Sequence, residues 1–270
     1  MFHFRAMLYW CEMKGMRRIK NRVLLKKRQY DELKEIKLDP AHYGVVLQPA
    51  SQLTYQYMAD LIHEVITIRL QRNPSALSVL DWGAGKGQVS YFLNKRGFKN
   101  ITLAEVEGYP NTALWKKMNA KKVYLQKEDK LPIASKTYDI VISAGVLEHV
   151  PHDQASLGEL QRVLKDDGLL FCFNLPARSG FIHQLSKILG DNYHDRLYSK
   201  KEIKFLLKRS GLKPLIMYRR QLLPKKKFNY KNPIKMDILD SILSIIPFVS
   251  LGTASLEFIA ENQNCHIQKG

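Results

Sequence analysis

Three glycines alternate with other residues in the segment Val79-Leu80-Asp81-Trp82-Gly83-Ala84-Gly85-Lys86-Gly87. Glycines at this spacing allow a sharp turn, and they let a ligand approach the backbone without interference from Cβ atoms. Dinucleotide-binding proteins use a similar turn. Here Asp81 directly precedes the turn, where its carboxylate can accept loop N–H groups and face a cationic ligand but would repel a pyrophosphate. The segment predicts a ligand with a positive end, with a ligand-free tight turn as the alternative.

A carboxylate follows at the distance expected for a ribose contact. Glu105 comes 24 residues after Asp81, near the end of the next apolar segment. An acidic side chain at this place can accept hydrogen bonds from both ribose hydroxyls. Glu107 is a competitor for the role, and an ordinary carboxylate at a strand end is the alternative interpretation.

His149 is the candidate general base. It follows the apolar run 139–144, so we expect it at the rim of a sheet where ligands bind. An imidazole can take up a proton near neutral pH. The alternative is a structural histidine that hydrogen-bonds its own loop and frames the ligand.

Four other side chains have weaker claims to a role. His183 and His194 lie in a segment expected to cover the active site, and surface histidines are the alternative. Tyr43 is a candidate lid residue, with simple packing as the alternative. Cys172 lies within an apolar run and is interpreted as a buried thiol.

The elements that would position these residues alternate between strands and helices. Continuous apolar strands separated by helices are typical of a parallel sheet covered on both faces. Strands are expected at 77–82, 101–106, 122–125, 139–144, 169–175, 212–223 and 254–260. Helices are expected at 17–39, 52–70, 88–95, 113–119, 154–164, 199–208 and 236–246, with a turn at 166–168.

Five segments, in this order, resemble motifs of the class I S-adenosylmethionine-dependent methyltransferases. They are Val79–Leu93, Leu131–Ser143, Val146-Leu147-Glu148-His149-Val150, Leu164-Lys165-Asp166-Asp167-Gly168-Leu169 and Ser199–Leu212. The likeness covers about residues 45–215. It implies a Rossmann-like, doubly wound α/β fold with a seven-stranded, mostly parallel sheet whose last strand is antiparallel.

The resemblance also implies how S-adenosylmethionine would bind. Glu105 would hold the ribose and Val106 would pack against the adenine. Backbone near the methionine moiety would come from Ser143 and Gly145. The methionine and ribose side would be lined by Asp81, Gly83, Gly85 and Gly87.

The sequence departs from the family pattern at the adenine site. The family often has an aspartate before the segment that matches Leu131-Pro132, but Lys127 stands at the aligned position. Glu128 or Asp129 would serve after a small loop shift. Ser143-Ala144-Gly145-Val146 replaces the Asn/Asp-Pro-Pro-aromatic run of enzymes that methylate exocyclic amines of nucleic acids, which argues against that class.

Charge is concentrated in two stretches. The chain of 270 residues has a formal net charge of +18, residues 1–40 carry eleven Lys/Arg against five Asp/Glu, and residues 200–235 carry thirteen against one. Such a basic surface attracts nucleic acid, anionic lipid or an anionic substrate. A solvated basic face without a partner is the alternative.

The domain prediction follows from these patterns. Residues 1–40 form a basic, helical N-terminal extension and residues 41–270 the methyltransferase domain. Within the domain, 177–200 is a variable lid segment, and 225–251 is an inserted basic loop with an amphipathic helix. That helix has apolar residues on one face and Asp237, Asp240, Ser241 and Ser244 on the other. It would lie on an anionic membrane, or pack as a cap on the sheet or over the acceptor pocket.

Three scattered cysteines form neither a disulfide framework nor a zinc pattern, so no metal is expected. We predict a cytoplasmic enzyme, peripheral contact with an anionic membrane being an option. It would transfer a methyl group from S-adenosylmethionine to a small-molecule, lipid-linked or sugar-linked acceptor, by O- or C-methylation through in-line displacement. The alternatives are an RNA or protein methyltransferase that uses the basic surface, and a non-enzymatic binding protein on the same fold.

Overall fold

The computed structural model describes residues 2–30, 33, 36, 38–108, 112–127, 129–180, 196–223, 232–246 and 248–263, with side chains from residue 13 on. Much of the predicted lid, with His183 and His194, lies outside these residues. So do Glu128 and the lysine-rich part of the predicted basic loop, 224–231.

Seven strands form one sheet in the order β3-β2-β1-β4-β5-β7-β6. The pairs β1–β2, β1–β4, β2–β3 and β4–β5 are parallel, whereas β7 runs antiparallel to β5 and β6. This arrangement confirms the predicted doubly wound α/β fold with its antiparallel last strand. The strands are β1 (Ser78–Trp82), β2 (Asn100–Val106), β3 (Lys121–Leu125), β4 (Tyr138–Ala144), β5 (Leu164–Pro176), β6 (Leu212–Arg220) and β7 (Ser255–Asn262).

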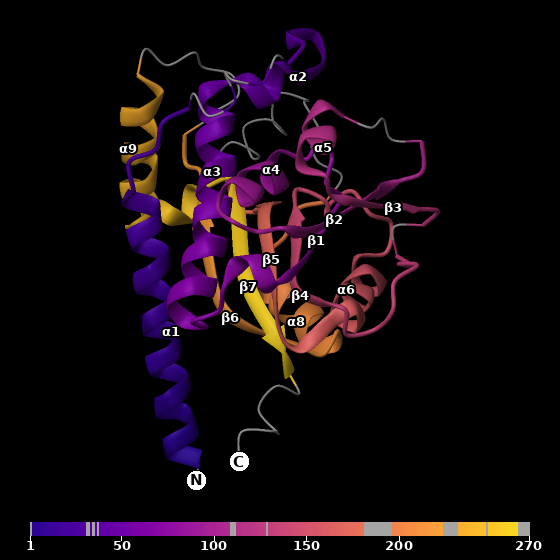
Figure 1. The fold of residues 1–270 in the computed structure, drawn as a ribbon. Helices are drawn as coiled ribbons and strands as arrows, with labels where there is room; N and C mark the ends of the chain where they lie inside the picture. The colour runs from indigo at the N-terminus through magenta and orange to yellow at the C-terminus, as the bar shows by residue number, and fades with distance from the viewer. Residues whose placement is uncertain are drawn as a thin grey trace.

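Helices cover both faces of the sheet because alternate residues of each strand point to opposite sides. In β1, Val79 joins one apolar core and Leu80 the other. Figure 1 shows α1, α3 and α9 together on one side of the sheet, with α6 and α8 on the other. The helices are α1 (Phe2–Leu25), α2 (Pro40–Leu47), α3 (Pro49–Glu64), α4 (Gln88–Lys95), α5 (Ala113–Met118), α6 (Asp153–Val163), α8 (Lys200–Arg209) and α9 (Pro233–Ile245), with short η1 (Val65–Arg69), η2 (Pro74–Ala76) and η3 (Val249–Gly252).

The parallel strands bring their carboxyl ends to one edge of the sheet, which we call the carboxyl edge. Open α/β sheets bind ligands at this edge, outside the strand ends. Trp82, the last residue of β1, pairs there in register with Ser143 near the end of β4. The glycine segment and the loop that holds His149 both begin at the same edge.

The N-terminal helix differs from the prediction. A helix was expected over 17–39, but α1 ends at Leu25. Arg28 causes the change: its buried guanidinium bonds Asp60 on α3 at 2.8 Å and also donates to the carbonyl of Val23 in the last turn of α1. The chain therefore leaves the helix to bring Arg28 to α3.

The expected turn at Asp166-Asp167-Gly168 is also different, because these residues lie within β5. Tyr138 pairs with Leu164 and Ile140 with Leu169, so β5 carries extra residues at this point, as in a bulge. Polar contacts with β4 keep the bulged segment on the sheet. For example, Lys165 Nζ donates to the carboxylate of Asp139 at 2.9 Å.

The polar face of α9 points inward, although apolar helix faces usually form the core contact. Asp237, Asp240, Ser241 and Ser244 are buried, while Leu239 is among the exposed residues. The helix packs on α1, α3 and β6 mainly through this polar face, with Ile245 partly buried against the core.

Among the helices that the structure describes, none has the length and apolar character required to cross a membrane.

Asp139 holds together the edge of the sheet opposite the carboxyl edge. Its buried carboxylate accepts hydrogen bonds from Arg72 (2.6 Å), Lys165 (2.9 Å), and the N and Oγ of Ser78 (2.9 and 2.7 Å). Burial alone would raise the pKa of Asp139, but these donors outweigh it and lower the pKa to about 2. One carboxylate thus joins β1, β4 and β5.

We expect Asp139→Asn to lower the free energy of unfolding by about 2 kcal/mol near neutral pH, because the partly exposed Arg72 and Lys165 lose their buried counter-charge. The depressed pKa means that the stabilisation is complete above about pH 4 and is lost as the pH falls through about 2. Urea denaturation measures the change. Asp167→Asn is the matched control, since Asp167 is exposed and meets Arg72 at 3.5 Å. Equal losses in the two variants would contradict the assignment.

Candidate functional site

Gly83 and Gly87 are required by the glycine turn itself. Both have positive φ, +68° and +81°, where side chains are strained. A Cβ on Gly83 would lie 2.4 Å from Cγ2 of Val146, and a Cβ on Gly87 would lie 2.6 Å from Cδ1 of Trp115. The turn therefore follows β1 closely and opens directly into α4, whose N-cap is Gly87.

Glu105 reaches the glycine turn from β2. The amides of Gly83 and Ala84 donate to the carbonyl of Ala104 at 2.9 and 3.1 Å. The carboxylate of the next residue, Glu105, then accepts from the amide of Gly85 at 2.8 Å. Glu107, the competitor, is exposed. The geometry places an acid and the loop amides side by side at the carboxyl edge.

The sequence predicts that Asp81 accepts hydrogen bonds from the loop amides, but its carboxylate contacts α4. Asp81 is 2% exposed, and its carboxylate accepts a hydrogen bond from Ser90 Oγ on α4 at 2.6 Å. Burial is the main cause that raises the pKa of Asp81 to about 7, and the nearby charge of Glu105 adds to it, against the hydrogen bond from Ser90. An acid poised near neutrality would be held in its charged form by a neighbouring cation.

Val106, Ser143 and Gly145 also lie at the carboxyl edge. Val106 is exposed at the end of β2, and Ser143 is buried in β4 between Trp82 and Cys172 in register. Gly145 has φ +71°, and its amide donates to the carbonyl of Phe173 at 3.0 Å. These residues border the glycine turn.

Asp129 lies in a turn closed by a bridge between Lys127 and Lys130. It is partly buried, and it follows β3, which neighbours β2. Its expected contact with adenine stays a prediction.

His149 projects from the loop after β4, where its side chain is half exposed. Its backbone amide donates to the carbonyl of Val146 at 2.9 Å. Its Nε2 lies 3.8 Å from Oε1 of Glu148, whose carboxylate is buried.

Glu148 and Asn174 lie at the same edge and are not among the site residues that the sequence predicts. A Cβ on Gly145 would lie 3.7 Å from Oε1 of Glu148 and 3.9 Å from Cβ of Asn174. The carboxylate beside a histidine in the motif could have pointed to Glu148. An asparagine directly after an apolar run is the signal for Asn174, since asparagine tolerates the left-handed conformation that it adopts here (φ +59°).

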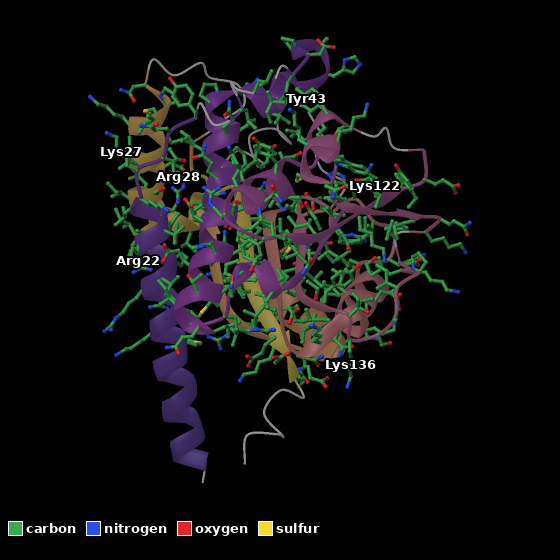
Figure 2. The ribbon with its side chains drawn as sticks, in the orientation of Figure 1. Arg22, Lys27, Arg28, Tyr43, Lys122 and Lys136 are labelled. Atoms are coloured by element: carbon green, nitrogen blue, oxygen red, sulfur yellow. The ribbon has the colours of Figure 1, made fainter. Side chains whose placement is uncertain are left out.

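Tyr43 connects α2 to α5 and to the glycine turn (Figure 2). Its hydroxyl accepts from the amide of Ala113 at the start of α5 at 2.7 Å. The ammonium of Lys86, in the glycine turn, lies 5.2 Å from the centre of its ring. Thr112 Oγ1 donates to the carbonyl of Lys86 at 2.9 Å, so α2, α5 and the turn form one unit. Tyr43 is buried in this contact.

Cys172 is buried in β5, and burial raises the pKa of its thiol well above the usual value. A reactive cysteine needs thiolate character and access, so this thiol has the structural role expected from the sequence.

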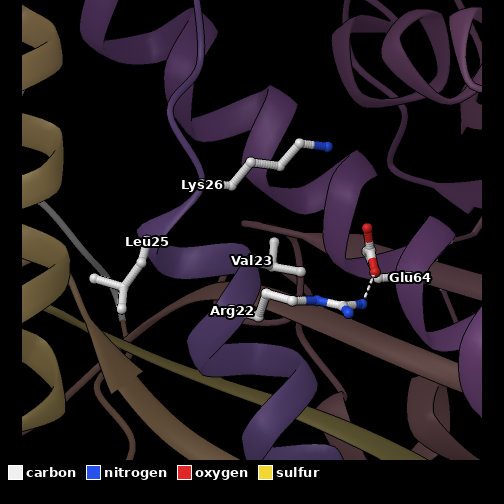
Figure 3. A pocket seen from close by; sticks show the side chains of 5 residues that line it. All are labelled: Arg22, Val23, Leu25, Lys26 and Glu64. Atoms are coloured by element: carbon white, nitrogen blue, oxygen red, sulfur yellow. Dashed lines mark hydrogen bonds and ion pairs between the residues drawn. The ribbon is translucent and has the colours of Figure 1, made fainter.

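A hollow of about 600 Å³ lies away from the carboxyl edge, between α1 and the end of α3 (Figure 3). It is lined by Arg22, Val23, Leu25, Lys26 and Glu64, and an ion pair between Arg22 and Glu64 crosses it. None of these residues belongs to the glycine turn or the loop of His149, so we do not assign this hollow to the reaction.

Residues 50–215 match the model of a family described as methyltransferase domain. The chain belongs to this family of S-adenosylmethionine-dependent methyltransferases. Among curated proteins it is 32% identical over 112 residues to the ubiquinone biosynthesis O-methyltransferase of Rickettsia akari, covering 41% of this chain and 45% of the relative. The match to the protein of the same name from Rickettsia conorii is 30% identical over 132 residues, covering 48% of this chain and 44% of that one. The chain thus spans less than half the length of these relatives.

Solved structures share the fold at low identity. A SAM-dependent methyltransferase from Thermotoga maritima superposes with a TM-score of 0.53 at 13% identity, covering 87% of this chain and 97% of that one. The 1,6-didemethyltoxoflavin-N1-methyltransferase of Burkholderia thailandensis, solved with 1,6-didemethyltoxoflavin and S-adenosylhomocysteine, gives 0.51 at 15%, covering 83% and 91%.

The residues at the glycine turn fit S-adenosylmethionine. Gly83 and Gly87 let the turn pack directly against Val146 and Trp115, which holds its backbone at the carboxyl edge. Glu105 supplies a carboxylate beside the turn, and Asp81 supplies a negative charge when ionised. An acceptor for hydroxyl groups and a charge opposite to that of a sulfonium are the two chemical features that this ligand needs.

We expect Asp81→Asn to raise the melting temperature of the ligand-free protein more at pH 8 than at pH 5. The raised pKa means that the stability contribution of Asp81 is complete below about pH 4 and is lost as the pH rises through about 7. Asparagine resembles the protonated acid and can still accept from Ser90.

Thermal unfolding followed by circular dichroism across this pH range measures the difference. Glu107→Gln, at an exposed carboxylate, is the control and should show no such trend. A gap between wild type and Asp81→Asn that is constant with pH would contradict the raised pKa.

Proposed function

We propose that this chain transfers the methyl group of S-adenosylmethionine to an oxygen atom of a small, largely apolar acceptor. The observation that carries the proposal is the glycine turn with Glu105 at Gly85, next to the edge where Glu148, His149 and Asn174 gather. The two curated relatives are named as O-methyltransferases of ubiquinone biosynthesis, which favours a hydroxylated quinone precursor, free or lipid-linked, over other acceptors.

The chemistry divides the site into two halves. When bound, S-adenosylmethionine supplies an electrophilic methyl group on a sulfonium. Glu105 and the glycine turn would fix the nucleoside end, and ionised Asp81 would favour the cationic ligand over its neutral product. The acceptor oxygen would attack the methyl carbon in line as the bond to sulfur breaks. Such positioning contributes up to about 7–11 kcal/mol to the lowering of the barrier.

His149 would receive the proton of the acceptor hydroxyl. It is accessible at the carboxyl edge, and the buried carboxylate of Glu148 at 3.8 Å would stabilise the imidazolium that forms. A general base of this kind accelerates a reaction by about 10²–10⁴-fold. The alternative is that His149 only frames the cofactor through its loop, whose amide already bonds Val146.

Calorimetric titration with S-adenosylhomocysteine tests the cofactor site. We expect the wild type to bind and Glu105→Gln to bind at least about tenfold more weakly, because it loses charged hydrogen bonds to the ribose. Glu107→Gln is matched in chemistry and lies two residues away, and it should change the affinity by less than about twofold. A folded wild type that does not bind S-adenosylhomocysteine would contradict the proposed function.

His149→Asn separates the two roles of the histidine. If His149 is the base, kcat for a hydroxylated quinone precursor falls by about 10²–10⁴-fold. The acidic limb of the pH profile is also lost, while the affinity for S-adenosylhomocysteine stays the same. If the residue only frames the cofactor, that affinity weakens and the shape of the pH profile is retained.

A further inference from the structure

The orientation of α9 is fixed by polar contacts on its buried face. Asp240 Oδ1 accepts from the amides of both Leu222 and Leu223 at 2.7 Å, which holds the end of β6. Asp237 lies 3.9 Å from the buried guanidinium of Arg28. Turning the helix to bury its apolar side would remove both contacts and expose two amides, so the apolar side stays outward.

The outward side forms one apolar surface, which we call the α9 face. Leu239, Ile242 and Ile246 follow each other at helical spacing and are all exposed. Phe248, which is 87% exposed, and Leu251 continue the surface through η3, and exposed Leu25 of α1 joins it. Figure 3 shows Leu25 at the rim of the hollow, on the side of α9. Contiguous exposed apolar surface of this kind marks an interaction site.

Both acids of α9, Asp237 and Asp240, are buried, so the described helix exposes no negative charge. Lys235 is exposed at the start of α9, and Lys27 is exposed just after α1 (Figure 2). An apolar surface edged by cations and without an exposed acid on this helix complements an anionic lipid bilayer.

Other occupants fit this surface less well. A second copy would bring together two chains that each carry a net charge of +18. RNA would pair with the lysines but would leave Leu239, Ile242, Phe248 and Leu251 in contact with water. An anionic bilayer would both bury the apolar side chains and pair with the cations, which the other two occupants would not do.

We propose that the α9 face docks this protein on anionic membranes, with α9 lying in the plane of the interface and Phe248 and Leu251 entering the acyl region. The docking stands on this surface alone and does not depend on the reaction.

The α9 face continues to the carboxyl edge. The carbonyl of Leu251 accepts from Ser179 Oγ at 3.0 Å and from Arg219 at 3.1 Å, and the amide of Ala254 donates to the carbonyl of Gln221 at 2.8 Å. Gln221 in turn donates to the side chain of Asn174 at 3.0 Å. This consequence rests on the proposed function: a lipid-linked acceptor would leave the bilayer next to the site.

Co-sedimentation with vesicles tests the docking. We expect the full chain to bind vesicles that contain phosphatidylglycerol, to bind pure phosphatidylcholine vesicles much more weakly, and to lose binding as salt rises. The double variant Phe248→Ser/Leu251→Ser should weaken the binding by about tenfold or more, because two apolar side chains no longer enter the bilayer. Phe205→Ser is the matched control: Phe205 is 59% exposed on α8, on the other face of the sheet, and its loss should change the binding by less than about twofold.

The docking would be overturned by a folded wild type that does not bind anionic vesicles, by equal losses in the two variants, or by a dimer in light scattering that only the double variant dissociates. Binding to RNA that the double variant leaves intact, without binding to vesicles, would also overturn it. Titration of the same preparations with S-adenosylhomocysteine keeps the two proposals apart. A wild type that binds S-adenosylhomocysteine but not vesicles disproves the docking only, and the reverse result disproves the function only.

Discussion

The close packing of the glycine turn against its neighbours is the constraint on which the rest of the site depends. Gly83 faces Val146 and Gly87 faces Trp115 at distances that exclude a Cβ atom on either glycine. Because the turn packs this closely on its neighbours, its amides reach the carbonyl of Ala104 on β2. The carboxylate of Glu105, the next residue, then lies beside the amide of Gly85. One turn thus sets the relative positions of β1, β2, α4 and the loop after β4.

The two edges of the sheet are built differently. At the edge opposite the site, Asp139 joins three strands through charged hydrogen bonds, an arrangement that favours stability. At the carboxyl edge, Gly145, Asn174 and Gln221 all have positive φ, a conformation that is costly for the glutamine side chain. Strained backbone held in place by a rigid sheet is typical of sites that bind ligands.

The basic N-terminal helix α1 is part of the packing of the protein. Met16, Val23 and Leu24 of α1 are buried in the same core as α3, and Lys20 is buried beside Tyr218, where desolvation is the main cause that lowers its pKa to about 8. Arg28 connects α1, α3 and α9 through Asp60 and Asp237. Cations that appear in the sequence as a charged extension are therefore partly internal, and they decide how α1 and α9 lie.

The sequence by itself determined the succession of strands and helices, the glycine turn and the acid at Glu105, because periodicity and turn chemistry act over a few residues. It also indicated the family through the order of its motifs. Only the tertiary structure decided that α1 ends at Leu25, that Asp166-Asp167-Gly168 lie within β5, and that α9 turns its aspartates inward. It alone brought Glu148, Gly145 and Asn174 together. The physical reason is that a buried polar group is stable only with a partner, and the partners of Arg28, Asp139 and Asp240 lie far away in the sequence.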